Sequence, residues 1–568
     1  MSAPMRTVRI AAAVFALALP AAAAAQAAGD IVLQGGAIYT LDAGHPWASA
    51  LVIADGRIAY VGDDGGARAH AGPGARTIAL AGRMVLPGFH DAHIHPMSGA
   101  LRLLRCRLGE FKTAPRVYAA IRACAAAKSG HDWLLGSGWS PEVVAHPTKE
   151  QLDALVPGRP AYLATEDGFT AWANSQALKI AGIDAKGPDT AGIERDPKTH
   201  EPTGKLKDGA VDRLRRVLPK PTEAEYREAL RRSTAMANRF GITSVFDADA
   251  AEQIVDAYRA ADLAGELTLR VVAAQSIDPA RGPEQVDEMV ARRDRVAGRR
   301  FRADAAKIFL DGEIDMHTAA LLEPYEDTPG ARGDLYMQPD ALDAVVRRLD
   351  AEGFLIHMHV MGDRSVRAGL DALELAAQAN GPRDRRDQLA HIGVADPADI
   401  ARFGRLGIAA NFTPMWFSAG DPAFMPAQAV LGPKRARWMY PMASVAAAGG
   451  RIIASSDWPS PSMNPLDAIQ VAVTRQPLDS SKPARQPQER VGLAAVLAAY
   501  TRDAAWAARE DPIDGTLEAG KAADLVVLDR NLFKTKPAAL HEAHVLLTLL
   551  DGEPVYRDPR FAWPNSSK

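Results

Sequence analysis

Short apolar runs alternate with amphipathic stretches along most of the chain. Eight of these runs read as buried β-strands: residues 84–95, 241–248, 269–276, 305–310, 354–360, 388–393, 407–414 and 451–458. Stretches rich in Ala, Leu and Arg separate most of them, and their apolar positions recur with helical spacing. Eight buried strands that alternate with helices predict an α/β fold built as a parallel (β/α)8 barrel.

A long segment, about residues 97–240, separates the first two strand-like runs. It contains a strand-like run of its own at residues 161–165 and turns rich in Gly and Pro at residues 187–204. We expect an inserted subdomain after the first barrel strand, or a lid over the barrel mouth.

Both ends of the chain show short alternating apolar runs joined by Asp-Gly and Gly-Glu turns, which predict hairpins. We expect residues 28–84 and residues 511–568 to pair into a small β-sandwich beside a barrel that spans residues 85–510.

Residues 1–27 differ from the rest. Arg6 and Arg9 precede an apolar run, and Ala25–Ala27 form a small-residue cleavage site. This pattern is typical of a cleaved secretory signal peptide, and the run is too short to span a bilayer comfortably. We therefore expect a periplasmic or secreted protein with no membrane span after cleavage.

Composition narrows the functional classes. The chain has 568 residues, 47% of them hydrophobic and 24% charged, and a formal net charge of -3. This is an ordinary globular composition, and it offers no basic surface for nucleic acid. Cys106 and Cys124 are the only cysteines. In an exported protein they can pair, but the sequence leaves a disulfide and two buried thiols equally open.

Histidines cluster at the end of the first predicted strand. His93 and His95 are two positions apart, so their side chains share one face of a strand. Barrel active sites form at the carboxyl ends of the strands, and two imidazoles on one face are half of a metal site. His90 lies an odd number of positions from both, so we expect it to face away in a structural role.

The other predicted strands supply matching chemistry. His357 and His359 close one strand, His391 ends the next, and Asp457 ends the last. Lys307 lies in an otherwise apolar run, where burial of a lysine is costly. Each residue alone has a structural explanation, but together they predict a catalytic metal site.

At this point the sequence resembles the amidohydrolase superfamily, and within it the amidohydrolase-3, or YtcJ-like, group. The matching stretches cover nearly the whole chain in order, and they include LPGFHDAHIH (86–95), AWANSQAL (171–178), KIFLDG (307–312), HVMGDRSV (359–366), SSDWPSPSMNPLDAIQVAVTR (455–475) and GTLEAGKAADLVVLD (515–529).

The resemblance implies a TIM-like barrel with a β-sandwich made from both chain ends. It also implies one or two divalent metal ions, and a lysine that is often carboxylated. Carried onto this chain, the ligands are His93, His95, Lys307, His359, His391 and Asp457. Imidazole and carboxylate ligands suit zinc, and manganese or iron can substitute. Such a metal makes hydroxide available near neutral pH, and Asp457 acts as general base and then general acid.

Two positions depart from the group's usual pattern: Phe169 stands where a histidine is common, and His317 where an arginine is common. Both are candidate substrate-binding residues. The further candidates are Trp139, Trp172, Asn174, His357 and Trp416. His357 faces the same side of its strand as His359, so support of the metal ligands is an alternative role for it. For a lone tryptophan, packing is the safer assumption.

The sequence therefore predicts an exported metal-dependent hydrolase that cleaves the carbon–nitrogen bond of a small-molecule amide, such as an N-acyl or N-formyl amine. Cyclic amides, carbamates and ester-like bonds are alternative substrates. A periplasmic protein that binds a metal or ligand without turnover is an alternative of another class. A homodimer is compatible with the resemblance.

Overall fold

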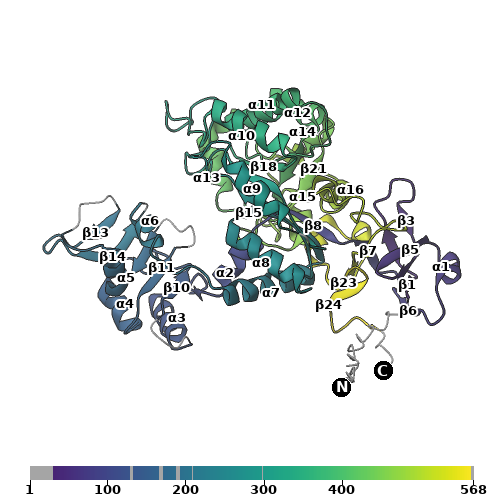
Figure 1. Ribbon diagram of the computed structural model, residues 1–568, viewed down its shortest axis with the longest axis horizontal. Helices are drawn as coiled ribbons and strands as arrows, with labels where there is room; N and C mark the ends of the chain where they lie inside the picture. The colour runs from purple at the N-terminus through teal and green to yellow at the C-terminus, as the bar shows by residue number, and fades with distance from the viewer. Residues whose placement is uncertain are drawn as a thin grey trace, which may run out of the picture.

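The computed structural model describes residues 30–127, 132–165, 170–186, 192–207, 209–296 and 298–563. Figure 1 shows a barrel in the centre, a β-sandwich on one side and a separate lobe on the other. The predicted signal peptide lies outside the described residues. Within them, no helix combines the length and apolar character needed to cross a membrane.

Eight parallel strands form the central sheet, in the order in which the chain visits them. They are β8 (Phe89–Ile94), β15 (Ile242–Ala250), β16 (Arg270–Ser276), β17 (Phe301–Phe309), β18 (Leu355–Val360), β19 (Gln388–His391), β20 (Ala409–Phe412) and β21 (Ile452–Ala454). The first and last strands meet where Asp457 N donates to His93 O at 2.8 Å and His95 N donates to Trp458 O at 2.9 Å. All eight predicted strands are therefore present, and the sheet nearly closes into the expected barrel.

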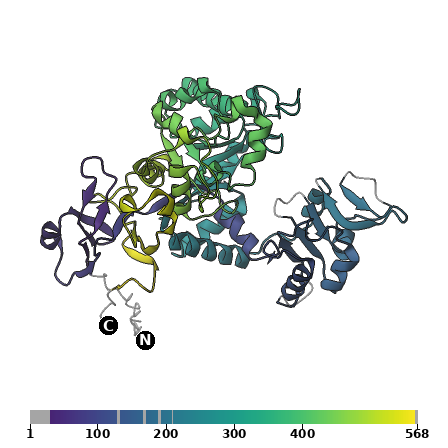
Figure 2. The same ribbon diagram turned by 180° about the vertical axis from the view of Figure 1, so that it is seen from behind.

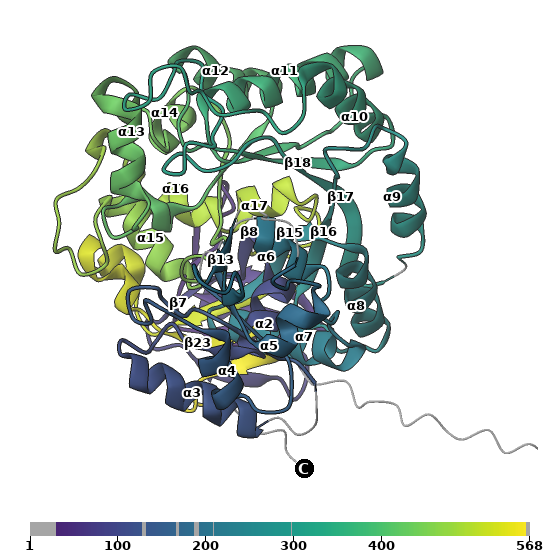
Figure 3. The same ribbon diagram turned by 90° about the vertical axis from the view of Figure 1, so that its left-hand side faces the viewer.

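Helices lie between the strands from β15 to β21, as the periodicity predicts. They include α8 (Glu252–Leu263), α9 (Gln285–Asp294), α10 (Pro339–Ala351), α11 (Asp363–Asn380), α12 (Pro397–Leu406) and α14 (Met442–Ala447). Figure 3 shows them arranged around the strands. Local chemistry defines their ends: at α12, the Asp396 side chain caps the first turn and Gly407 ends the helix at φ +68°.

The first predicted strand is two strands. β7 (Met84–Pro87) pairs with the sandwich, and only β8 belongs to the barrel. Gly88 joins them, and a Cβ atom at this position would collide with the side chain of Thr243. The periodicity continues through this junction because both strands are fully buried, so the pattern alone could not reveal the break.

The sandwich combines both ends of the chain. One sheet has the order β5-β4-β1-β6, and the other has the order β24-β23-β22-β7-β2-β3. The amino-terminal strands are β1 (Ile31–Gln34), β2 (Ala37–Tyr39), β3 (Trp47–Ala48), β4 (Ala50–Ala54), β5 (Arg57–Gly62) and β6 (Arg76–Ala79). The carboxy-terminal strands are β22 (Leu525–Leu528), β23 (Val545–Leu550) and β24 (Glu553–Arg557). A common apolar core holds the two sheets together.

The insertion has its own sheet, with the order β13-β14-β12-β11-β10-β9. Its strands are β9 (Cys106–Arg107), β10 (Leu134–Ser137), β11 (Ala161–Ala164), β12 (Thr170–Ala173), β13 (Ile193–Arg195) and β14 (Pro202–Lys207). Its helices are α3 (Ala114–Ala127), α4 (Lys149–Leu155), α5 (Ser175–Ile180) and α6 (Gly209–Arg215). A disulfide between Cys106 and Cys124 ties β9 to α3, which answers the question left open by the sequence.

The insertion stands apart from the barrel. It is joined to the barrel through α2 (Pro96–Leu103), which packs on α7 (Glu223–Arg239). Figures 1 and 2 show it as a separate lobe from opposite sides. A subdomain is thus present, but a lid closed over the barrel mouth is not the arrangement in this structure.

Candidate metal centre

The expected ligands gather at the carboxyl ends of the barrel strands. They are His93 and His95 at the end of β8, Lys307 in β17, His359 in β18, His391 at the end of β19 and Asp457 just after β21. The ring centroids of His93 and His391 lie 4.6 Å apart, and those of His359 and His391 lie 4.7 Å apart. Strands far apart in sequence thus place these side chains around one point.

Asp457 joins the two histidines of β8. Its Oδ1 lies 3.3 Å from His93 Nε2 and 3.2 Å from His95 Nε2. The Asp457 backbone has φ +52° and donates its N–H to His93 O, so its position is fixed by the strand that it follows. Two imidazole nitrogens and a carboxylate oxygen within 4.8 Å of one another form a donor group suited to a divalent metal.

Lys307 is buried among these groups. Its side chain is 1% exposed, and its Nζ lies 3.4 Å from His93 Nε2 and 4.6 Å from the centre of the Phe309 ring. Burial lowers the pKa of Lys307 to about 8, while Asp249 and Asp457 oppose the shift. A lowered pKa increases the fraction of neutral amine near neutral pH, and the neutral amine is the form that reacts with carbon dioxide.

Among the expected ligands that the structure describes, two ring nitrogens are buried without a hydrogen-bond partner. They are His359 Nε2 and His391 Nδ1. Burial, followed by the charge of Lys307, lowers the pKa of His359 to about 3, and burial also holds the pKa of His391 well below its usual value. Both rings are therefore neutral and offer a lone pair. Because a buried polar atom without a partner is costly, these nitrogens fit ligands of a metal ion.

A hydrogen-bond chain orients His93. Asn411 Nδ2 donates to Gln388 Oε1 at 3.1 Å, and His357 Nδ1 lies 3.2 Å from the same oxygen. The oxygen can only accept, so His357 carries its proton on Nδ1 and accepts at Nε2 from His93 Nδ1, 2.9 Å away. His93 Nε2 is then left as a lone pair on the side of Lys307 and Asp457.

His357 lies behind His93 and supports it. It was a candidate for binding substrate, but it is fully buried behind His93 and stacks on Phe246 with ring centroids 5.0 Å apart. The period of two puts His357 and His359 on the same face, and only the tertiary contacts separate a supporting histidine from a ligand.

Asp247 is a further site residue that the sequence reasoning missed. It lies in β15, it is buried, and it accepts a hydrogen bond from Tyr258 OH at 2.9 Å. Burial raises the pKa of Asp247 to about 6, while the charge of His95 opposes the shift. The available signal was the FDAD stretch of an otherwise apolar strand, where a carboxylate needs a reason to be buried.

Trp416 is the candidate substrate residue that contacts the ligand cluster. Its ring stacks on His391 with centroids 4.9 Å apart and planes 30° apart. His317 instead pairs with Asp327, with its Nε2 2.9 and 3.0 Å from the two carboxylate oxygens, and its ring packs near Tyr325. Phe169 lies outside the described residues.

The remaining candidates lie in the core of the insertion. Trp139 Nε1 donates to Leu163 O and Trp172 Nε1 donates to Thr148 O, both at 2.8 Å, and both rings are at most 1% exposed. Asn174 caps α5 by accepting a hydrogen bond from Ala177 N, and its side-chain amide forms two further hydrogen bonds, one accepted and one donated, with main-chain groups outside the helix. In this structure these three side chains hold the insertion together instead of facing the metal ligands.

His90 has the structural position expected of it. Its Nε2 lies 3.1 Å from Asp514 Oδ1, and its Nδ1 lies 3.6 Å from Glu510 Oε2. The three groups are close enough to hold a metal, but Arg270 Nε lies 3.4 Å from Asp514 and 2.7 Å from Asp524. The cation of Arg270 makes this cluster an ion-pair network that fastens β8 to the segment after the barrel.

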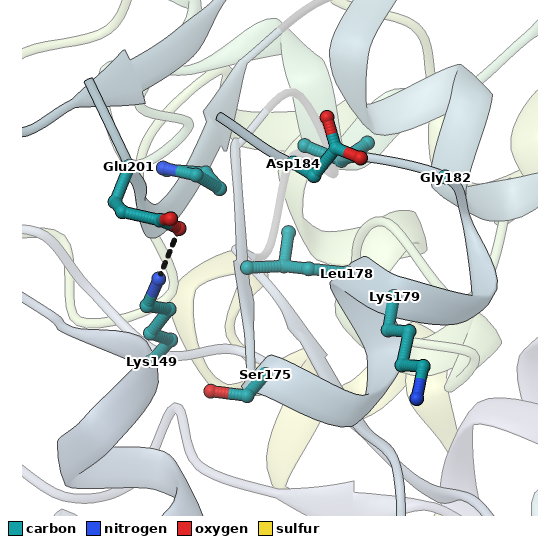
Figure 4. A pocket seen from close by; sticks show the side chains of 9 residues that line it. Lys149, Ser175, Leu178, Lys179, Gly182, Asp184 and Glu201 are labelled. Atoms are coloured by element: carbon teal, nitrogen blue, oxygen red, sulfur yellow. Dashed lines mark hydrogen bonds and ion pairs between the residues drawn. The ribbon is translucent and has the colours of Figure 1, made fainter. Parts of the chain in front are cut away.

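The insertion carries a cavity of its own, with a volume of about 260 Å³. Figure 4 shows Lys149 reaching across it to Glu201, with Lys179 and Asp184 on other sides. Its lining contains none of the metal-site histidines. The cavity is therefore distinct from the centre at the barrel strands.

Comparison with known proteins identifies the family. The amidohydrolase family matches residues 76–556. The chain belongs to the amidohydrolase family. Protein LONG AFTER FAR-RED 3 of Arabidopsis thaliana is 31% identical over 546 residues, which are 93% of this chain and 91% of that protein. N-substituted formamide deformylase of Arthrobacter pascens is 28% identical over 540 residues, which are 92% of this chain and 97% of that protein.

A solved structure shares the fold over most of the length. An uncharacterized metal-dependent hydrolase from Pyrococcus furiosus aligns with a TM-score of 0.75 and 25% identity, over 88% of this chain and 99% of that one. The resemblance inferred from the motifs is confirmed, and this amidohydrolase is a metal-dependent enzyme.

Proposed function

We propose that this amidohydrolase is exported and cleaves a linear amide of a small molecule, an N-formyl or N-acyl amine, at the site formed by Asp457 and the surrounding histidines. The observation that carries the proposal is the arrangement of Asp457 across His93 and His95, next to the partnerless nitrogens of His359 and His391. The similarity to N-substituted formamide deformylase over 92% of the chain supports a formamide as the first substrate to test.

The residues fit a bound divalent metal, which would be held by the histidines and Asp457. Such a metal supplies Lewis acidity and activates water near neutral pH. Zinc suits this donor set best, and a carboxylated Lys307 would add a second anionic group for a pair of ions. The buried amine beside His93 supports that modification.

Asp457 moves the proton in this scheme. It takes a proton from the attacking water and returns it to the nitrogen of the departing amine, which is general base and then general acid catalysis. Its side chain is only 13% exposed, so its carboxylate meets the substrate in a site that is largely shielded from water. His93 is held by His357, and Trp416 packs against His391. The reacting groups are therefore preorganised.

Export is supported by two independent features. The first 27 residues have the pattern of a secretory signal. The disulfide between Cys106 and Cys124 is of a kind that persists in oxidising compartments. Both features support a periplasmic or secreted location.

A substrate panel tests the proposed reaction. The purified protein, loaded with zinc or with manganese, is offered the formamide and the acetamide of one primary amine, together with a cyclic amide, a carbamate and an ester. Protein stripped of metal with a chelator is the control. We expect release of the free amine from the formamide or acetamide by loaded protein alone. Turnover confined to the cyclic amide, carbamate or ester would refute the linear-amide assignment.

A further inference from the structure

Glu313 places an unassigned carboxylate beside the metal centre. It lies in the loop after β17, six positions beyond Lys307. Its Oε1 is 3.9 Å from His359 Nε2, the buried nitrogen without a hydrogen-bond partner. No ion pair joins Glu313 to a lysine or arginine within the part of the chain that the structure describes. Its carboxylate therefore faces a ligand nitrogen without a counter-charge.

The loop holds Glu313 in this place. Asp311 accepts hydrogen bonds from Ala320 N, Met361 N and Gly362 N at 2.8–2.9 Å, which ties the loop to the end of β18. The main chain of Glu313 is bonded in both directions: its N donates to Thr318 Oγ1 at 2.9 Å, and its O accepts from Thr318 N at 3.0 Å. The backbone position of Glu313 is thus set by the fold.

The distance fits two ligands of one ion. Zinc lies about 2.0–2.1 Å from an imidazole nitrogen and about 2.0–2.2 Å from a carboxylate oxygen. Two such atoms bound to one ion are about 3.4 Å apart at a tetrahedral angle and at most about 4.3 Å apart. The observed separation of 3.9 Å lies between these values, so a small movement brings both atoms to one ion.

We propose that Glu313 is a further carboxylate ligand of the metal ion that His359 binds. The proposal rests on the metal-dependent function above, and it adds a further negative charge to that of Asp457. The Glu313 side chain is 45% exposed, whereas that of His359 is 9% exposed.

Metal affinity tests this assignment without reference to turnover. Glu313→Gln removes the charge while keeping the shape, and Glu323→Gln is the matched control, because Glu323 is an exposed glutamate of the same loop. The zinc affinity and the zinc content per chain are measured for both variants and the parent protein, by competition with a coloured chelator and by elemental mass spectrometry.

We expect Glu313→Gln to bind zinc at least about 10-fold more weakly than the parent, since even residues that only support a ligand change metal affinity by about 10–100-fold. Glu323→Gln should equal the parent. Equal zinc affinity and content in Glu313→Gln and the parent would overturn the ligand role while leaving the proposed function intact. A parent protein that takes up no metal would defeat both.

Glu313→Asp provides a second check that does not depend on the loss of charge. It keeps the negative charge but shortens the side chain by one methylene group. If Glu313 is a direct ligand, Glu313→Asp should also bind zinc more weakly than the parent, because the shortened side chain no longer places the carboxylate on the ion. Parent-like affinity in Glu313→Asp would mean that the charge acts at a distance and would overturn direct ligation.

Discussion

The hydrogen bond between His357 and His93 can be tested with two substitutions of His357, which we expect to change the metal affinity by different amounts. His357 Nε2 accepts from His93 Nδ1 at 2.9 Å, and this bond leaves His93 Nε2 free to bind a metal. A glutamine at position 357 can place its carbonyl oxygen near the site of Nε2. An asparagine is too short to do so, and it leaves the buried N–H of His93 without an acceptor.

The expected magnitude follows from the type of contact. Loss of a partner that orients a metal ligand costs about 10–100-fold in affinity, which corresponds to about 1.4–2.7 kcal/mol. His357→Asn should weaken zinc binding by this amount, and His357→Gln should weaken it clearly less. Zinc affinity is measured by chelator competition, with circular dichroism to verify folding. If the two folded variants bind zinc equally, the orienting role of His357 is refuted.

Three further predictions concern catalysis, covalent structure and pH. Asp457→Asn should fold and keep some metal but lose at least about 100-fold in kcat, measured as amine release; normal turnover would exclude the proton transfer assigned to this carboxylate. Replacing Cys106 and Cys124 by serine should destabilise the insertion by about 3 kcal/mol, because the bridge closes a loop with a sequence separation of 18. Urea unfolding followed by the fluorescence of the buried insertion tryptophans measures this, and unchanged unfolding would contradict it. Burial alone lowers the pKa of His90, but the charges of Asp514 and the neighbouring carboxylates outweigh burial and raise this pKa. The ion pairs of protonated His90 therefore stabilise the fold below the ordinary histidine pKa. This stabilisation is lost as pH rises through the raised pKa. His90→Gln should therefore destabilise the protein more at about pH 5.5 than at about pH 9, and a larger loss at the higher pH would reverse the assigned sign.

The barrel could be predicted because its strands are buried on both sides. Such strands read as continuous apolar runs, and their carboxyl ends coincide with the polar residues that interrupt those runs. Residues two positions apart on a strand face the same side, so the spacing of His93 and His95 indicated from sequence alone that the two side chains lie together. Lys307 was conspicuous for the same reason, as a charge within an apolar strand.

The missing parts depend on contacts between distant segments. Asp247 and Glu313 each have other acidic residues two positions away, so the sequence does not single them out, and only the closed barrel brings them near the histidines. His357 and His359 share a face, so periodicity could not tell that one supports His93 and the other keeps a free nitrogen. The matching stretch around Trp172 indicated a functional surface, but its side chains fill the core of the insertion.

The position of the insertion relative to the barrel also could not be predicted from the sequence. Its apolar runs predict a folded unit, but the direction in which that unit leaves the barrel depends on α2 and its packing against α7. The sequence could not decide whether Cys106 and Cys124 form a disulfide. Their Cα atoms lie 5.7 Å apart because of the pairing of β9 and the course of α3, and neither can be predicted from the spacing of the two cysteines.

The metal content of protein purified without chelators tests the central claim most directly. Elemental mass spectrometry should find one or two divalent ions per chain, and two ions together with a mass increase of one carbon dioxide would support carboxylated Lys307. A protein that contains no metal, and takes up none when zinc or manganese is added, would contradict the assignment of His93, His95, His359, His391 and Asp457 as its ligands.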